Sequence, residues 1–265
     1  MNRSQRDKAP QLWGKSKVLQ AWQGRFVTEA ELIKLNNPSD YSDSDSKIYL
    51  GEIEGQHYFV VHKEFEGGHT LREIAAHLDE VTGELATTAL ALANWHETHV
   101  KCPRCGADTK IIQNGWVREC VVDNTQHFPR TDPAIIVAVT DRNGRLCLGR
   151  QAVWAEGRYS NFAGFVEPGE SLEDAVIREV KEESSLKVSE IKYLSSQPWP
   201  FPNSIMLAFE AVTDNPEDAR PDGEEIVDIK WFSKEELIAA VADGSLNLPP
   251  SYSVSGKMIA HWLNG

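Results

Sequence analysis

The segment GFVEPGESLEDAVIREVKEESSL, residues 164–186, decides how this 265-residue chain is interpreted. It contains seven carboxylates, and three of them fall within REVKEE. Residues 167–170 (EPGE) predict a tight turn. Ser171 with Asp174 resembles a capping box, which predicts a helix that begins near Leu172. The function of this helix depends on whether its carboxylates face the solvent or the rest of the fold.

A helical wheel places the carboxylates on the side of the helix that carries its apolar residues. At about 100° per residue, Glu179 and Glu183 lie about 40° apart, and Glu182 lies about 60° to the other side of Glu179. The apolar residues that share the arc of Glu179 and Glu183 are Leu172, Ala175 and Val176. A solvated acidic face would lie opposite this stripe, whereas two carboxylates interrupt it. Divalent cations relieve both the repulsion and the desolvation of such groups, and oxygen ligands favour Mg²⁺ or Mn²⁺. On the wheel alone, a metal site and a solvated face remain equal alternatives.

Glycines on the N-terminal side of this helix favour close approach of a ligand. Gly164 and Gly169 lack side chains, so the backbone can come near a bound group. Gly164 also leaves the carbonyl of Ala163 free to coordinate a metal.

The composition and net charge of the chain limit the kinds of partner that it can bind. Hydrophobic residues make up 41% of the chain, which permits a buried core, and the formal net charge is −13. That charge argues against a broad basic surface for nucleic acid, but metal ions could still bridge the protein to a small anionic substrate. No apolar run reaches the roughly 18 residues of a membrane span, and residues 1–17 lack a signal-peptide core. We therefore expect a cytoplasmic protein without membrane contact.

Strand and helix patterns interleave along the chain and predict an α+β fold with a mixed sheet. Residues 47–64 read as two strands, residues 70–81 and 86–99 as helices, and residues 133–151 as a hairpin around Asn143 and Gly144. The polar loop at residues 39–47 lacks the glycine of a calcium loop, so we reject that interpretation. Three regions follow: an N-terminal domain (1–98), a small metal-stapled unit (99–130) and a C-terminal domain (131–265).

The acid-rich segment resembles the signature of a known family. Gly164, Glu170, the run REVKEE from Arg178 and then Leu186 are similar to the Nudix box, G-x5-E-x7-R-E-U-x-E-E-x-G-U. Ser185 stands where the box has glycine, which usually closes the helix in a left-handed turn. The resemblance implies a Nudix fold, in which helices sandwich a mixed sheet. It also implies that Glu179, Glu182 and Glu183 hold the metals, with Glu183 the most sensitive position.

A second motif indicates a branch of this family. Residues 196–204, SQPWPFPNS, resemble the signature of the NADH pyrophosphatase (NudC-like) branch, which also carries a zinc unit before the Nudix domain. The resemblance implies hydrolysis of NADH or NAD⁺ to AMP and nicotinamide mononucleotide, with removal of NAD caps from RNA as a related activity. A further glutamate is implied after the next strands; Glu225 matches best, and Glu224 is its competitor.

The branch also implies how the nucleotide is bound. Phe165 and Phe128 match positions that sandwich the base, and the residue that matches Phe128 comes from a partner subunit, so a homodimer is implied. Without the resemblance, core packing is the simpler interpretation of either phenylalanine. Gln197 and Ser204 are candidate polar contacts to the nucleotide. Alternatively, SQPWPFPNS is only a stiff edge strand.

The cysteines predict one structural zinc ion. Cys102 and Cys105 form a CxxC pair, and Cys120 follows after fourteen residues. The family pattern implies a fourth cysteine at position 123, where this chain has Asp123. We favour Asp123 on spacing, although His127 is the better zinc ligand chemically. A water ligand and a weakly held or absent metal also remain open, and a redox CxxC is the rival interpretation.

Two further functions remain as alternatives. The chain could be an inactive module that senses nucleotides, but the intact REVKEE argues against this. It could instead be a Nudix hydrolase for ADP-ribose or diadenosine polyphosphates, but SQPWPFPNS argues against that.

Overall fold

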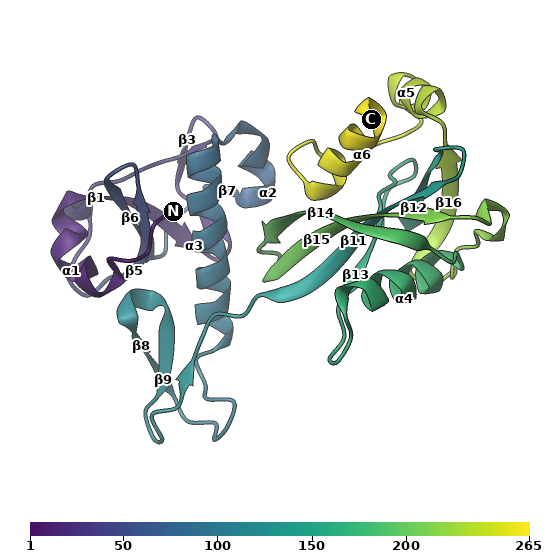
Figure 1. The fold of residues 1–265 in the computed structure, drawn as a ribbon. Helices are drawn as coiled ribbons and strands as arrows, with labels where there is room; N and C mark the ends of the chain where they lie inside the picture. Colours follow the sequence, from purple (N-terminus) through teal and green to yellow (C-terminus); the bar gives the residue numbers. More distant parts are fainter. The chain divides into compact units, whose positions relative to one another are not determined.

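The computed structural model describes residues 1–265, which form two compact units, each with its own sheet (Figure 1). The first comprises Met1–Thr131 and Trp199–Asn203, and the second comprises Asp132–Pro198 and Ser204–Gly265. No helix is both long and apolar enough to cross a membrane. The division into residues 1–98, 99–130 and 131–265 stays a prediction.

The first unit is built on a five-stranded sheet with the order β5–β6–β1–β2–β7. Its strands are β1 (Ser16–Trp22), β2 (Arg25–Phe26), β5 (Ser46–Ile53), β6 (Gln56–His62) and β7 (His69–Thr70), and β3 (Thr28–Glu29) pairs with β4 (Leu32–Ile33) apart from it. The two strands expected over residues 47–64 are β5 and β6, which form a hairpin that turns at Glu54 and Gly55 with φ angles of 49° and 81°. β1 then runs parallel to β6.

The helix α3 (Glu80–Thr98) is the main helix of this unit. Its apolar side packs into the core under the sheet with Leu85, Ala86, Ala89 and Leu90. The single helix expected over residues 70–81 is wrong, since α2 (Leu71–Ile74) is followed by a 3-10 turn, η4 (Ala75–His77), and a break. The reason is local, because the carboxylate of Asp79 accepts the amide of Thr82 at 2.7 Å and starts a new helix.

Short helical turns complete the unit. They are η1 (Arg6–Lys8), α1 (Ala9–Leu12), η2 (Trp13–Lys15), η3 (Pro38–Asp40) and η5 (Gln113–Gly115).

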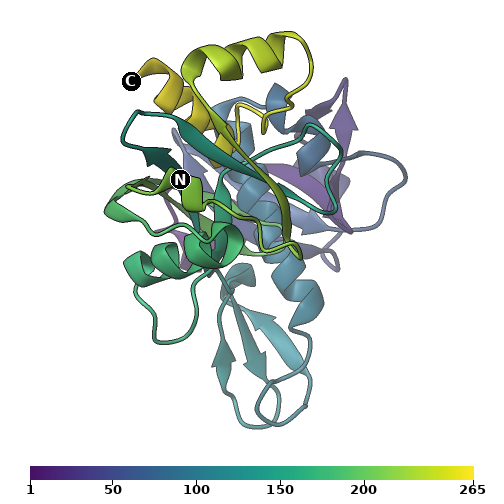
Figure 2. The same ribbon diagram turned by 90° about the vertical axis from the view of Figure 1, so that its right-hand side faces the viewer.

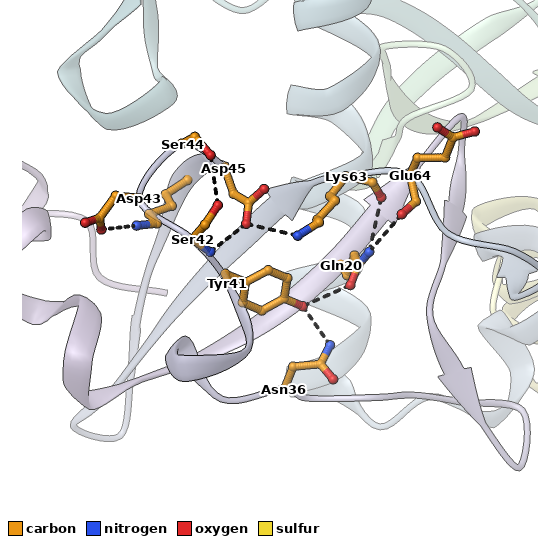
Figure 3. A network of polar contacts seen from close by, with 10 residues as sticks. Gln20, Asn36, Tyr41, Ser42, Asp43, Ser44, Asp45, Lys63 and Glu64 are labelled. Carbon is orange, nitrogen blue, oxygen red and sulfur yellow. Dashed lines mark hydrogen bonds and ion pairs between the residues drawn. The ribbon is translucent and has the colours of Figure 1, made fainter.

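The polar loop at residues 39–47 is held by protein groups (Figure 3). The carboxylate of Asp45 accepts the amide of Ser42 at 2.7 Å and the ammonium of Lys63 at 3.1 Å. The hydroxyl of Tyr41 donates to Gln20 at 3.2 Å. Burial raises the pKa of Tyr41 to about 12, and the amide of Ser42 lowers that of Asp45. These bonds account for the loop as an ordinary polar segment.

A separate three-stranded sheet contains Cys120 and follows Cys102 and Cys105 in the chain. Its strands are β8 (Thr109–Ile112), β9 (Val117–Cys120) and β10 (Gln126–His127). Arg118 lies on β9, and its buried guanidinium donates to Thr109 Oγ1 at 2.7 Å and contacts Nδ1 of His96 at 3.1 Å. Nε2 of His96 lies 2.8 Å from the carbonyl of Gly115. This network joins α3 to the small sheet.

The middle of the SQPWPFPNS motif belongs to the first unit, since Trp199–Asn203 is part of it. The amide of Asn94 donates to the carbonyls of Pro200 (3.1 Å) and Pro202 (2.9 Å). The guanidinium of Arg72 lies 4.1 Å from the ring centre of Phe201, a cation–π contact. These contacts fix the segment that separates Gln197 from Ser204 in the sequence.

The second unit contains a mixed six-stranded sheet with the order β14–β15–β11–β12–β16 and with β13 beside β11. The strands are β11 (Asp132–Asp141), β12 (Leu146–Gln151), β13 (Phe162–Phe165), β14 (Ser189–Trp199), β15 (Ser204–Thr213) and β16 (Ile226–Phe232). β11 is parallel to β15 and antiparallel to β12 and β13. The hairpin expected around Asn143 and Gly144 joins β11 to β12.

Helices cover both faces of this sheet (Figures 1 and 2). They are α4 (Leu172–Ser184), α5 (Lys234–Ala242) and α6 (Val254–Asn264), with a 3-10 turn, η6 (Pro216–Asp218), before β16. Alternate residues of β11 divide between the faces: Ile135 and Val137 pack with α4, whereas Ile136 and Ala138 pack with α5 and α6. The predicted α+β fold, a mixed sheet sandwiched by helices, is confirmed.

Candidate active site

The acid-rich helix α4 has the expected start and an unusual end. The hydroxyl of Ser171 accepts the amide of Asp174 at 3.1 Å, so the helix begins at Leu172. At the other end Ser185 has φ 62° and ψ −1°, the left-handed conformation that glycine adopts most easily. The backbone thus follows the glycine geometry although the residue is serine.

The three carboxylates of REVKEE differ in exposure as the wheel predicts. Glu183 is 4% exposed. The side chain of Glu179 is 14% exposed and that of Glu182 is 59% exposed. Burial raises the pKa of Glu183 to about 8, and the negative charge of Glu225 adds to the effect. Burial also raises the pKa of Glu179. Two carboxyl groups are therefore held on the inner side of the helix at an electrostatic cost.

Arg178 organises the outer part of the site. Its guanidinium binds Glu170 through two hydrogen bonds of 2.7 and 2.9 Å, which lower the pKa of Glu170 to about 2. The same group contacts Glu179 at 2.9 Å, Glu182 at 3.0 Å and the carbonyl of Phe165 at 2.9 Å. One cation thus ties the turn before α4 to the helix and to β13.

The glycine of the box lies against the helix. A Cβ on Gly164 would fall 1.9 Å from Cδ of Glu179, so no side chain fits there. One residue earlier, the amide of Ala163 donates to Glu183 at 3.1 Å. β13 therefore presents bare backbone to both buried carboxylates.

Glu225 lies near enough to the carboxylates of α4 to act on them electrostatically. Its negative charge is among the causes that raise the pKa values of both Glu179 and Glu183. Glu225 is fixed at three atoms: its carboxylate accepts Gln151 Nε2 at 3.0 Å, its carbonyl accepts the amide of Ala152 at 3.1 Å, and its amide donates to Asp222 at 3.1 Å. Sequence reasoning missed Gln151 and Asp222. Asp222 could have been found, because aspartate before glycine often forms a turn with the amides that follow it.

These residues fit a divalent cation. Glu183 receives only one hydrogen bond from the protein, and like charges from Glu179, Glu225 and Asp222 push its pKa upward. A bound cation would reverse this cost, and carboxylate oxygens are ligands suited to Mg²⁺ or Mn²⁺. Because Gly164 has no side chain, the carboxyl group of Glu179 can lie directly against the backbone of β13.

The two phenylalanines proposed to stack on the base are both exposed. Phe165, on β13, is 57% exposed, and Phe128, in the first unit, is 58% exposed. Core packing is therefore not their role in either unit. Each presents an apolar ring to its surroundings, as a stacking residue must.

Gln197 and Ser204 have less free surface. The amide of Gln197 donates to the carbonyl of Tyr252 at 2.9 Å, and its Oε1 accepts the amide of Val254 at 2.6 Å. Ser204 is 7% exposed at the start of β15. Gln197 thus holds the loop that leads into α6. The edge-strand interpretation fits the first residues of the motif only, since β14 is at the sheet edge and ends at Trp199.

The cysteine site has four candidate ligands close together. The ligand atoms of Cys102, Cys105, Cys120 and Asp123 all lie within 4.8 Å of one another. Although burial alone would raise it, the pKa of Cys102 is lowered to about 7 by the amides of Arg104 and Cys105 and by a side-chain hydrogen bond with His127. Three sulfurs and one oxygen suit zinc. His127 also remains a candidate, because its Nε2 is buried without a hydrogen-bond partner.

Comparisons with known proteins agree with this geometry. Residues 130–252 match the NUDIX domain family. The NAD-capped RNA hydrolase NudC of Mycobacterium bovis (strain BCG / Pasteur 1173P2) is 37% identical over 233 residues, 81% of this chain and 74% of that protein. The human NAD-capped RNA hydrolase NUDT12 is 37% identical over 199 residues, 70% of this chain and 43% of that protein. Among solved structures, a NUDIX hydrolase from Nitrosomonas europaea aligns with a TM-score of 0.45 and 19% identity, covering 56% of this chain and 96% of that one.

The box on α4, the NUDIX domain match and the identity to NudC define the class of the protein: it is a hydrolase of the Nudix family, whose members use divalent metals. Within that family, the identity over most of both chains places it in the NudC-like branch. Both predictions are confirmed.

Proposed function

We propose that this protein hydrolyses the pyrophosphate bond of NADH and NAD⁺, giving AMP and the corresponding nicotinamide mononucleotide, and that it removes NAD caps from RNA. The observation that carries the proposal is the set of carboxylates from Glu179, Glu183 and Glu225, gathered where β13 meets α4. Relatives named as NAD-capped RNA hydrolases support the substrate class. The reaction adds water across the bond between phosphorus and the bridging oxygen.

Glu179, Glu182, Glu183 and Glu225, with the carbonyl of Ala163, would hold Mg²⁺ or Mn²⁺. When bound, such an ion neutralises the diphosphate and lowers the pKa of a coordinated water. The side chains of the protein would then orient the reacting groups and accept a proton. Glu183 is buried, so a bound cation would offset its charge where solvent cannot. A carboxylate beside the attacking water can accept its proton. Arg178 keeps Glu179 and Glu182 from separating.

The nucleotide base would stack on Phe165, and Phe128 of a second subunit would cover its other face. Both rings are exposed in their own units, so each is available for such a contact. A homodimer is part of this proposal. Ser204 would lie near the nucleotide, and Gln197 would act through the loop at Tyr252 and Val254.

The zinc ion would be structural, held by Cys102, Cys105, Cys120 and Asp123, with His127 as the alternative fourth ligand. The first three ligands and Asp123 leave no open position for a substrate. The ion would stabilise the three-stranded sheet by cross-linking its loops, because this sheet has little apolar core of its own.

A panel of diphosphates at equal concentration tests the proposal. The panel holds NADH, NAD⁺, NAD-capped RNA, ADP-ribose and diadenosine tetraphosphate, and kcat/KM is measured for each with Mn²⁺. We expect the nicotinamide dinucleotides or the capped RNA to rank first. A preference for ADP-ribose or the diadenosine compound would assign another substrate, and binding of nucleotides without any cleavage would favour the sensor function.

A further inference from the structure

In the turn before β16, the carboxylate of Asp222 accepts hydrogen bonds from the backbone amides that follow it. Oδ1 of Asp222 accepts the amides of Glu224 at 3.0 Å, Glu225 at 3.1 Å and Ile226 at 2.8 Å. Gly223, with φ 82°, closes the turn by donating to the carbonyl of Ile226 at 2.9 Å. Successive amides that converge on one oxygen form a rigid concave turn. This turn is the segment that presents Glu225.

Glu225 must be positioned accurately, because it lies in a surface turn whereas the carboxylates with which it would share a cation lie on α4. Glu225 itself is exposed, although the residue after it, Ile226, is buried in the core. Its other two anchors, Gln151 and the amide of Ala152, come from the end of β12. Without the Asp222 bonds, only its contacts with Gln151 and Ala152 and the burial of Ile226 would hold the residue, and its side chain would be less well directed.

We propose that Asp222 is a positioning residue for the cation site, acting through the backbone of Glu225 rather than as a ligand. Oδ1 already accepts three amides, and Oδ2 lies 3.4 Å from the amide of Glu225. The carboxylate therefore serves the turn. This inference rests on the proposed role of Glu225 as a metal ligand.

The test measures direct binding of Mn²⁺ to the full chain by electron paramagnetic resonance, without any nucleotide. Loss of a residue that orients a metal ligand typically weakens metal affinity by about 10- to 100-fold. We therefore expect Asp222→Ala to weaken Mn²⁺ binding by about this factor. Asp222→Asn keeps an oxygen acceptor at the same place and should stay within about threefold of the unaltered protein. Asp218→Ala, which removes a carboxylate from the preceding 3-10 turn, η6, is the matched control and should have no effect.

A double-mutant cycle separates positioning from a general loss of structure. In a Glu225→Gln background, Asp222→Ala should change Mn²⁺ affinity by less than about twofold, since its effect passes through Glu225. An additive loss would overturn the inference. An Asp222→Asn variant as weak as Asp222→Ala would overturn it too, because the negative charge of Asp222 would then act on the cation site directly and not through the turn. Circular dichroism checks that each variant folds. Because binding is measured without substrate, a protein that binds Mn²⁺ as expected but leaves NADH intact would refute the proposed function alone.

Discussion

The carboxyl group of Glu179 occupies the space that any side chain on residue 164 would need. A Cβ at Gly164 would lie 1.9 Å from Cδ and 2.0 Å from Oε1 of Glu179. The glycine of the box is therefore required by close approach between β13 and α4. Its backbone angles impose no such requirement, since φ of Gly164 is not in the left-handed region.

Gly164→Ala should displace the carboxylate of Glu179 and reduce hydrolysis, while the helix itself stays folded. We expect a fall in kcat/KM of about 100-fold, since a displacement of about 1 Å can cost this much. Steady-state kinetics with far-ultraviolet circular dichroism measure both quantities. Gly83→Ala, in α3 with open space around it, is the control and should leave activity unchanged. Full activity of Gly164→Ala would show that Glu179 need not lie where the structure has it.

Ser185→Gly should stabilise the protein. Ser185 adopts a left-handed conformation, and glycine there should gain about 0.5–1 kcal/mol in the free energy of unfolding. Urea denaturation, followed through the unfolding transition of the second unit, measures the change in the free energy of unfolding. Ser189→Gly, in the extended strand β14, should instead lower stability by a similar amount. Equal effects of the two substitutions would contradict the account of the helix end.

His96 should make the first unit sensitive to mild acid. Burial, together with the charge of Arg118, lowers its pKa to about 4 from 6.5, although its bond to Gly115 opposes the shift. The unfolded chain binds a proton on His96 below about pH 6.5 and the folded chain only below about pH 4, so stability falls as the pH falls between these values. The loss should approach ~3 kcal/mol at pH 4.

Thermal unfolding from pH 7 to pH 4 measures this loss, and His96→Gln, which cannot titrate, isolates it from the carboxylates. The difference between the two proteins should shrink as the pH falls. A constant difference would mean that the pKa of His96 is the same in the folded and unfolded states.

The fourth zinc ligand can be identified by metal content. Asp123→Ala should lower the zinc bound per chain or weaken it in competition with a chelator by at least about tenfold, whereas Asp123→Cys should bind more tightly than the unaltered protein. His127→Ala should keep its zinc. If His127→Ala loses the ion and Asp123→Ala keeps it, the ligand is His127. Inductively coupled plasma mass spectrometry and chelator titration give both readings.

Much of α4 could be predicted because its signals are local. The cap at Ser171 sets the start of the helix, and the period of the apolar residues places Glu179 and Glu183 in the apolar arc with Glu182 at its border. The same holds for the hairpin at Glu54 and Gly55, where the turn residues define the backbone angles.

Contacts between distant segments could not be predicted. Nothing near SQPWPFPNS indicates that Asn94 and Arg72 hold its central residues, or that the amide of Gln197 is used by the backbone before α6. The anchoring of Glu225 likewise depends on how the turn at Asp222 meets β12. In each case a side chain is placed by partners more than fifty residues away or by a turn geometry that spacing alone leaves open.

The most direct test of the central claim is to mix the purified protein with NADH and Mg²⁺ or Mn²⁺ and to separate the products by chromatography, with Glu183→Gln assayed alongside. The account predicts AMP and reduced nicotinamide mononucleotide in equal amounts. Glu183→Gln should lower the rate at least ~100-fold, and EDTA should abolish the reaction. Intact NADH with both metals would contradict the proposed activity, and an unimpaired Glu183→Gln variant would contradict the role of the buried carboxylate.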